Sequence, residues 1–209
     1  MSEVDAREAK RALRAAQKAR RAGLFEAHPE AATALLQHLP PGLRPRVVSG
    51  TTPMGSELDP RPLMRHLAAR GAQLALPRTP PRGQPLTFHV WTEETRFAPG
   101  RFGLDEPAAD TPALVPDLVL VPLLAFDGAG RRLGSGGGYY DATLRALRAA
   151  GPVFALGVAF SGQQVDAVPC EAFDEPLDAV LTEAGWLEVA PLNPGTDVFS
   201  AGEGRPPRR

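Results

Sequence analysis

A nearly continuous apolar run, Asp-Leu-Val-Leu-Val-Pro-Leu-Leu-Ala-Phe-Asp at residues 117–127, constrains the fold of this chain more than any other feature. A strand with one face in solvent alternates apolar and polar residues, and this run does not. It is typical of a strand that is buried on both faces, as in a parallel sheet. Because helices cover both faces of such a sheet, the run predicts an α/β fold.

Segments with strand and helix patterns alternate along the rest of the chain. The patterns predict strands at 47–48, 73–76, 86–91, 153–160 and 179–182, and helices at 6–23, 31–39, 62–70 and 139–150. Residues 96–116 are polar and rich in proline, and we expect them to be irregular. The alternation predicts one three-layer domain over residues 1–189, with a mostly parallel central sheet and helices on both faces. Residues 190–209 lose all periodicity, and we expect a disordered tail there.

The composition argues against several classes of protein. The net charge of −1 is too small for a protein that binds nucleic acid or acidic membranes through bulk charge. No run approaches the roughly 18 apolar residues of a membrane-spanning helix, and the N-terminus lacks the apolar core of a signal peptide. Cys170 is the only cysteine, which excludes an internal disulfide and a cysteine-based zinc site. We therefore expect a cytoplasmic protein with no membrane or nucleic-acid partner. We also expect a monomer.

The most informative segment for function is a glycine-rich stretch between the buried run and the predicted helix at 139–150. It reads Arg-Arg-Leu-Gly-Ser-Gly-Gly-Gly-Tyr-Tyr-Asp over residues 131–141, and its residues 134–138 are called the Gly loop below. Glycines let the backbone approach a ligand closely, and consecutive N–H groups before a helix bind anions. An arginine fork suits phosphate oxygens, and Asp141 can hold Mg²⁺ through a carboxylate oxygen. The stretch therefore predicts phosphate binding.

Two known phosphate-binding motifs do not fit this loop. No Gly-Lys-Ser/Thr follows as in a P-loop, and Gly-x-Gly-x-x-Gly fits from neither Gly134 nor Gly136. A flexible surface loop is the alternative interpretation. The setting between a strand and a helix, together with the flanking charges, favours a phosphate site.

The segment Arg132–Asp141 resembles the signature of the 5-formyltetrahydrofolate cyclo-ligase family, also called methenyltetrahydrofolate synthetases. The resemblance continues in order from about Lys10 to Trp186. Lys10-Arg-Ala-Leu-Arg14 resembles the family's N-terminal ATP-contacting segment, whose two outer cations share one face of a helix. The resemblance implies that ATP is bound by Lys10, Arg14, Arg132, Gly134, Ser135, Gly136, Gly137, Gly138, Tyr139 and Tyr140. The alternative for the N-terminal cations is a solvated helix face shared with Arg7, Arg11, Lys18 and Arg21.

The resemblance also implies where the folate binds. Residues 57–60 resemble a Glu-Val-Asp-Thr segment whose first residue contacts the folate, and here this residue is Glu57. Thr52 falls at a second substrate contact, and Glu106 belongs to a Glu-Pro pair that lies near the pterin. From the residues alone, Glu57 serves equally well as a negative charge at a helix N-terminus.

A magnesium site is implied in the same way. Residues 171–174 resemble a Glu-x-His-Asp element, so Asp174 is implied to share Mg²⁺ with Asp141. The alternative for Asp174 is an ordinary loop acid. Three residues depart from the family pattern: Ser135 where a larger side chain is usual, Phe173 in place of histidine, and Pro60 in place of threonine.

The resemblance implies an ATP- and Mg²⁺-dependent conversion of 5-formyltetrahydrofolate to 5,10-methenyltetrahydrofolate, with release of ADP and phosphate. Phosphorylation of the formyl oxygen would give an imidate phosphate, which the nitrogen at position ten would then attack. No general base is evident, and no catalytic residue is assigned. Two other classes stay open: a non-catalytic nucleotide- or RNA-binding module on the same fold, and a different phosphate-handling enzyme such as a sugar-phosphate isomerase.

Overall fold

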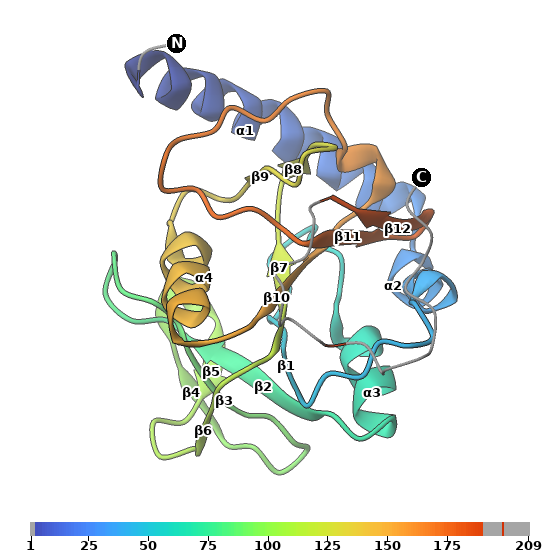
Figure 1. Ribbon diagram of the computed structural model, residues 1–209, viewed down its shortest axis with the longest axis vertical. Coiled ribbons are helices and arrows are strands. Elements are labelled where there is room, and N and C mark those ends of the chain that lie inside the picture. Colours follow the sequence, from blue (N-terminus) through green and yellow to red (C-terminus); the bar gives the residue numbers. More distant parts are fainter. Residues whose placement is uncertain (1–2, 190–197, 199–209) are drawn as a thin grey trace.

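The computed structural model describes residues 3–189 and residue 198. Its main sheet has eight strands in these residues, in the spatial order β12 (Gly185–Glu188), β11 (Ala179–Thr182), β10 (Phe154–Val158), β7 (Leu118–Pro122), β1 (Val47–Ser49), β2 (Gln73–Arg78), β3 (Thr87–Val90) and β6 (Ala113–Leu114) (Figure 1). The neighbours from β11 to β2 pair in parallel. Antiparallel pairs occur only towards the two edges of this sheet. The mostly parallel sheet that the buried run predicted is confirmed.

Helices cover both faces of the sheet, as predicted. On one face, α3 (Arg61–Ala69) and the helical segment formed by α2 (Ala31–Ala34) and the 3₁₀ turn η1 (Leu35–His38) pack on Leu118 and Leu120 of β7. On the other face, α4 (Tyr139–Ala150) packs on Val119 and Val121. Because successive strand side chains point to opposite faces, β7 contributes to both cores, which explains its unbroken apolar sequence.

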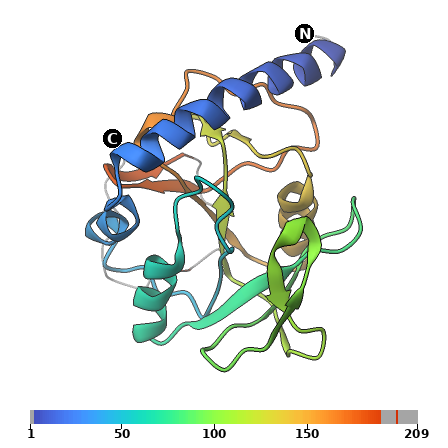
Figure 2. The same ribbon diagram turned by 180° about the vertical axis from the view of Figure 1, so that it is seen from behind.

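The long helix α1 (Glu3–Ala27) lies across the end of the sheet at which the parallel strands finish (Figures 1 and 2). It packs against the 3₁₀ turn η3 (Ser161–Gln163), which follows β10, and a Cβ atom on Gly162 would collide with Leu24. The expectation that this helix stops at Gly23 was wrong. A single glycine inside a helix costs only about 1 kcal/mol relative to alanine, and the helix runs on to Ala27, just before Pro29.

Residues 96–116 are not irregular, which corrects the prediction made for them. They form a hairpin of β4 (Phe97–Pro99) and β5 (Asp105–Pro107), joined by the 3₁₀ turn η2 (Arg101–Gly103), and then the edge strand β6. The hairpin is held from outside, since the Arg78 guanidinium donates to the Pro107 carbonyl and the Thr79 N–H donates to Glu106 Oε2 at 3.2 Å. These contacts come from residues distant in sequence, so periodicity could not reveal them.

Only residues 118–122 of the apolar run at 117–127 form the strand β7. After β7 the chain enters a two-stranded ribbon, β8 (Ala125–Phe126) with β9 (Arg132–Leu133), which leads into the Gly loop. The turn of this ribbon is fixed by the buried carboxylate of Asp127, which accepts hydrogen bonds from the N–H groups of Ala129, Arg131 and Val168.

The last strand, β12, was missed because its four residues show no clear alternation.

Most of the predicted tail, residues 190–197 and 199–209, lies outside the described residues. Val198 is the exception within this segment. Its side chain is buried in the core beside α2 and α3, and its carbonyl accepts a hydrogen bond of 2.6 Å from the Arg44 N–H. None of the helices that the structure describes has the length and apolar character needed to cross a membrane.

Candidate active site

The order of the strands places a ligand crevice between β1 and β7. From β1 the chain passes through α3 on one face of the sheet to β2, and from β7 it passes through α4 on the other face to β10. The two connections therefore leave adjacent parallel strands in opposite directions. In open α/β sheets, ligands bind at the carboxyl ends of the strands where this reversal occurs. The loops that leave β1 and β7 here carry Glu57 and the Gly loop.

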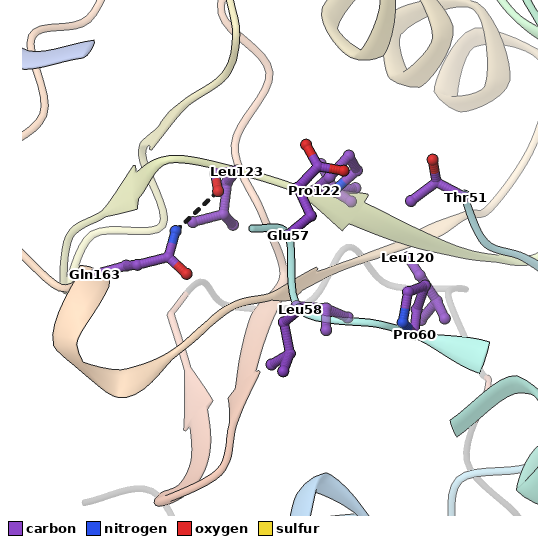
Figure 3. A pocket seen from close by; sticks show the side chains of 10 residues that line it. Thr51, Glu57, Leu58, Pro60, Leu120, Pro122, Leu123 and Gln163 are labelled. Atoms are coloured by element: carbon purple, nitrogen blue, oxygen red, sulfur yellow. Dashed lines mark hydrogen bonds between the residues drawn. The ribbon is translucent and has the colours of Figure 1, made fainter. Parts of the chain in front are cut away.

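A pocket opens at this position (Figure 3). Apolar side chains from the ends of β7 and β10, among them Leu120 and Val158, form much of its wall. Its polar lining groups are Thr51, Glu57 and Gln163. The Gln163 amide is fixed, because its Nε2 donates to the carbonyl of Leu123 at 2.8 Å. An apolar pocket with a few convergent polar groups is the usual form of a small-molecule site.

The Glu57 carboxylate is held by α1. Its Oε1 accepts from Arg21 Nη1 at 3.3 Å and its Oε2 accepts from the Met54 N–H at 3.0 Å, and both charged side chains are buried. Glu57 lies four residues before α3, so the alternative of a helix N-terminal charge does not hold. The alternative of a solvated helix face fails for Arg21, whose guanidinium also donates to Ser56 Oγ at 3.2 Å.

The Tyr140 hydroxyl is buried at the start of α4. Tyr140 is the second residue of α4, and its side chain packs against the core beneath that helix. Burial raises the pKa of Tyr140 above its ordinary value, and the charge of Glu57 raises it further, whereas a hydrogen bond with Thr51 and the charge of Arg132 lower it.

The Gly loop has the form expected of an anion site. Gly136 and Gly138 have φ of +98° and +72°, in the left-handed region that favours glycine, and Gly138 caps α4. The carbonyls of this loop point to two cations, since Arg14 Nε donates to Gly134 O and Arg82 Nη2 donates to Gly136 O, both at 3.0 Å. No N–H group from residue 135 to residue 141 donates a hydrogen bond within the described residues. These N–H groups, at the start of a helix, remain available to a phosphate.

Arg132 and Asp141 form an ion pair beside the Gly loop. Arg132 Nη2 donates to Asp141 Oδ1 at 2.7 Å, and the same oxygen accepts from the Glu175 N–H at 3.1 Å. The guanidinium also donates to the Glu175 carbonyl, and only 4% of the Arg132 side chain is exposed. Burial lowers the pKa of Arg132, and the Asp141 carboxylate opposes this effect. Arg132 therefore positions Asp141, and its charge is already neutralised.

Lys10 is bonded to two carboxylates from the loop before β11. Its Nζ donates to Glu171 Oε2 at 2.7 Å and to Asp174 Oδ2 at 2.6 Å, and its side chain is 6% exposed. The Lys10 ammonium also lies 6.0 Å from the ring centroid of Phe173. This ion cluster joins α1 to residues 171–174, so Lys10 and Asp174, both expected at the site, are in direct contact.

The ion cluster predicts a change in stability at high pH. Burial lowers the pKa of Lys10, but the hydrogen bonds and charges of Asp174 and Glu171 outweigh it, so the pKa lies above its ordinary value of 10.5. The stability gained from a raised lysine pKa is complete below pH 10.5 and is lost as the pH rises through the pKa of the folded state. We expect Lys10→Met to lower the free energy of unfolding by about 2 kcal/mol at pH 8, and this difference to shrink above pH 10.5.

Denaturant unfolding of both proteins at several pH values measures this difference. Lys18→Met is the control, since Lys18 is an exposed residue of the same helix. A difference between wild type and Lys10→Met that stays constant to pH 12 would contradict the coupling.

Asp141 and Asp174, the two acids expected to hold Mg²⁺, can supply only part of the ligands that the ion needs. The hydrogen bonds described above use one oxygen of each carboxylate, which leaves the second oxygen of Asp141 and of Asp174 open to an ion. Among residues 3–189 and 198, no three His, Cys, Asp or Glu side chains gather as a metal-binding group. Mg²⁺ commonly binds through one or two carboxylates and completes its shell with water and substrate phosphates. The donor set therefore suits an ion that arrives with a phosphate ligand.

The remaining predicted residues lie around the crevice. Thr52 follows Thr51, which lines the pocket, whereas Thr52 itself is not among the lining residues. Glu106 is buried in the β4–β5 hairpin, where its carboxylate accepts from Thr79. The same hairpin places the ring of Phe102 edge-on to that of Tyr139, with centroids 6.1 Å apart. The roles of Thr52 and Glu106 as substrate contacts stay predictions.

Sequence reasoning missed several residues of the crevice. Lys10, Arg14, Gln17 and Arg21 follow the i, i+4, i+7, i+11 spacing of one helix face, and this face is turned towards the site. That spacing was the signal that would have added Gln17 and Arg21. Arg82 gave no such signal, because it reaches the Gly loop from the connection between β2 and β3.

Comparison with known proteins shows which family this chain resembles. The model of the 5-formyltetrahydrofolate cyclo-ligase family matches residues 6–183, which is most of the chain. The chain belongs to this family. A 5-formyltetrahydrofolate cyclo-ligase from Escherichia coli K12 is 34% identical over 160 residues, which are 73% of this chain and 86% of the relative. One from Mycolicibacterium smegmatis is 36% identical over 151 residues, covering 66% of this chain and 73% of that protein.

Solved structures of the cyclo-ligase family have the same fold. The structure of a 5,10-methenyltetrahydrofolate synthetase from Aquifex aeolicus superimposes with a TM-score of 0.71 at 27% identity, over 88% of this chain and 94% of the other. A synthetase from Mycoplasma pneumoniae has a TM-score of 0.64 at 21% identity, and covers 83% and 98% of the two chains, which shows the fold alone. The family resemblance of the Gly-loop signature is thereby confirmed.

Proposed function

We propose that this protein converts 5-formyltetrahydrofolate to 5,10-methenyltetrahydrofolate with ATP and Mg²⁺, releasing ADP and phosphate. Family membership supports the folate substrate and the cyclisation. The observation that carries the ATP requirement is the Gly loop. Its N–H groups carry no hydrogen bond within the described residues, and Arg14 and Arg82 lie against it with no acidic partner there.

The reaction needs a phosphate site and a folate site side by side. The Gly loop and Arg14 hold the triphosphate, and the pocket next to Glu57 holds the pterin end of the folate. The γ-phosphoryl group passes to the formyl oxygen and gives an imidate phosphate. The nitrogen at position ten then forms a bond to the formyl carbon and loses its proton, and the carbon–oxygen bond breaks to release phosphate. Most of the catalysis is positioning and charge stabilisation, as is general for phosphoryl transfer.

The side chains around the Gly loop divide this work. Asp141 and Asp174 are the residues that hold Mg²⁺, and the ion supplies positive charge that offsets the charge of the phosphates. Arg132 fixes the Asp141 carboxylate, and Lys10 fixes that of Asp174. Lys10 and Arg14 thus act from one helix, the first holding the ion site and the second facing the Gly loop.

Mixing the purified protein with 5-formyltetrahydrofolate, ATP and Mg²⁺ tests the proposal, with methenyl formation followed by absorbance. We expect product only when all three are present. Product without ATP would overturn the proposed reaction, and turnover of a sugar phosphate instead would favour an isomerase. Salt-sensitive RNA binding with no ATP turnover would favour the non-catalytic module.

Glu57→Gln separates the folate site from the nucleotide site. The amide keeps an oxygen for Arg21 but loses the charge, so we expect the KM for 5-formyltetrahydrofolate to rise about tenfold, as for the loss of one hydrogen bond. The KM for ATP stays unchanged. Initial rates at varied concentrations of each substrate measure both constants. Glu26→Gln, an exposed position on α1, is the control, and a defect confined to ATP would contradict the assignment.

A further inference from the structure

The turn between β2 and β3 brings an arginine from a distant part of the chain to the Gly loop. The turn is closed by a hydrogen bond of 3.3 Å from the Gln84 N–H to the Pro81 carbonyl, and Arg82 lies at its tip. The end of the turn is fixed to α4, because the N–H of the buried residue Leu86 donates to Thr143 Oγ1 at 2.9 Å. The turn therefore lies beside α4 (Figures 1 and 2), where its tip can reach the loop that precedes this helix.

Arg82 touches the Gly loop through a single hydrogen bond, from its Nη2 to the Gly136 carbonyl at 3.0 Å. A guanidinium has five N–H donors, and the other donors of Arg82 form no hydrogen bond within the described residues. The residue is exposed, and no carboxylate in that part of the chain pairs with it. A carbonyl does not neutralise a positive charge, so Arg82 keeps both its charge and free donors at the loop.

The charge of Arg14 lies against the same glycine. Its Cζ is 3.5 Å from the position that a Cβ atom on Gly136 would take, and its Nε donates to the Gly134 carbonyl. Two guanidinium groups are thus held at one residue of the loop, and neither has an acidic partner in the part of the chain that the structure describes. Like charges at short range repel each other. The arrangement therefore points to an anion that binds between Arg14 and Arg82.

We propose that Arg82 is a second phosphate-binding arginine of the nucleotide site, which holds the triphosphate of ATP together with Arg14. This inference rests on the proposed function, and it adds a residue that the family resemblance does not include. The free N–H groups of an arginine fork donate well to phosphate oxygens. Because Arg14 comes from α1 and Arg82 from the β2–β3 turn, the two elements are joined through the bound nucleotide.

The test measures dissociation constants for ATP with Mg²⁺ and for inorganic triphosphate, by isothermal titration calorimetry on the full chain. We expect Arg82→Ala to weaken the binding of both ligands about 3- to 20-fold, between the effect of an exposed ion pair and that of a charge-assisted hydrogen bond. The melting temperature without ligand and the dissociation constant for 5-formyltetrahydrofolate do not change. Weaker binding of ATP with unchanged binding of triphosphate would place Arg82 at the nucleoside and overturn the inference.

Two further variants separate the charge of Arg82 from its contact with the Gly136 carbonyl. Arg82→Gln keeps an N–H donor for this carbonyl but has no charge, and we expect it to bind ATP as weakly as Arg82→Ala. Arg82→Lys keeps the charge without the fork, and we expect it to recover part of the lost affinity. Full recovery in Arg82→Gln would show that Arg82 only holds the loop in place, which would overturn the inference.

Arg65→Ala is the matched control, since Arg65 is an exposed arginine on α3, which packs on the face of the sheet opposite to α4. It keeps the dissociation constants of wild type. If wild type binds ATP and Arg82→Ala binds both phosphate ligands equally well, the inference is wrong while the proposed function stands. If wild type itself binds neither ATP nor triphosphate, the proposed function fails instead.

Discussion

Asp141→Ala is expected to lower the free energy of unfolding by about 3 kcal/mol in the absence of any ligand, because it leaves the Arg132 guanidinium buried without its carboxylate. Removing one partner of a buried ion pair leaves an uncompensated charge, and here the Glu175 N–H loses its acceptor as well. This expected loss of stability lies at the lower end of the range for broken buried ion pairs, because the Asp141 side chain is 26% exposed. Urea unfolding followed by circular dichroism measures the loss.

Two further variants sharpen this result. Asp141→Asn keeps an oxygen for Arg132 and the Glu175 N–H and is expected to lose about 1 kcal/mol, the contribution of an ordinary hydrogen bond. Asp166→Ala removes an exposed carboxylate and is expected to unfold like wild type. If Asp141→Ala unfolds at the wild-type urea concentration, the pair makes no contribution to stability. The activity of Asp141→Ala is interpretable only at temperatures where it is fully folded.

Arg14→Ala is expected to raise the KM for ATP about 10- to 100-fold while the unfolding free energy changes little. A charge-assisted hydrogen bond contributes roughly 1.5–3 kcal/mol, and within the described residues Arg14 contacts the Gly134 carbonyl but no acid. Its charge is therefore available to a phosphate, unlike the neutralised charge of Lys10. Initial rates at varied ATP concentration give the KM.

Arg11→Ala is the matched control for Arg14→Ala, since Arg11 is an exposed arginine on the same helix. It is expected to keep the KM of wild type. Arg14→Ala with an unchanged KM for ATP, or with a raised KM for the folate alone, would remove Arg14 from the nucleotide site. Either result would also weaken the ATP assignment of the Gly loop.

The sequence pattern predicted the central architecture well because the core strands and helices have strong local signals. The unbroken apolar run gave β7, and the helix at 139–150 was predicted with the limits of α4. The hairpin of residues 97–107 was missed, since its strands are short and depend on Arg78 and Thr79 from a distant segment. The sequence pattern of the hairpin itself cannot reveal contacts with side chains from a distant segment.

The candidate site was predictable to the extent that motifs lie together in sequence. The Gly loop and Asp141 form one continuous stretch, and the family resemblance added Lys10, Arg14, Glu57 and Asp174. What the structure added is the set of pairings. Arg132 binds Asp141 and Lys10 binds Asp174, while the expected contacts of Arg132 and Lys10 with ATP stay predictions. Pairing partners 164 residues apart cannot be derived from one sequence.

The docking of α1 has a consequence for the order in which the site forms. Helix α1 is synthesised first, but the carboxylates that bind Lys10 belong to Glu171 and Asp174, which are 161 and 164 residues further along the chain. On the ribosome, α4 and the strands up to β10 are synthesised before these two carboxylates. Contacts of such long sequence separation form slowly, so nucleotide affinity should be the last property that a nascent chain acquires.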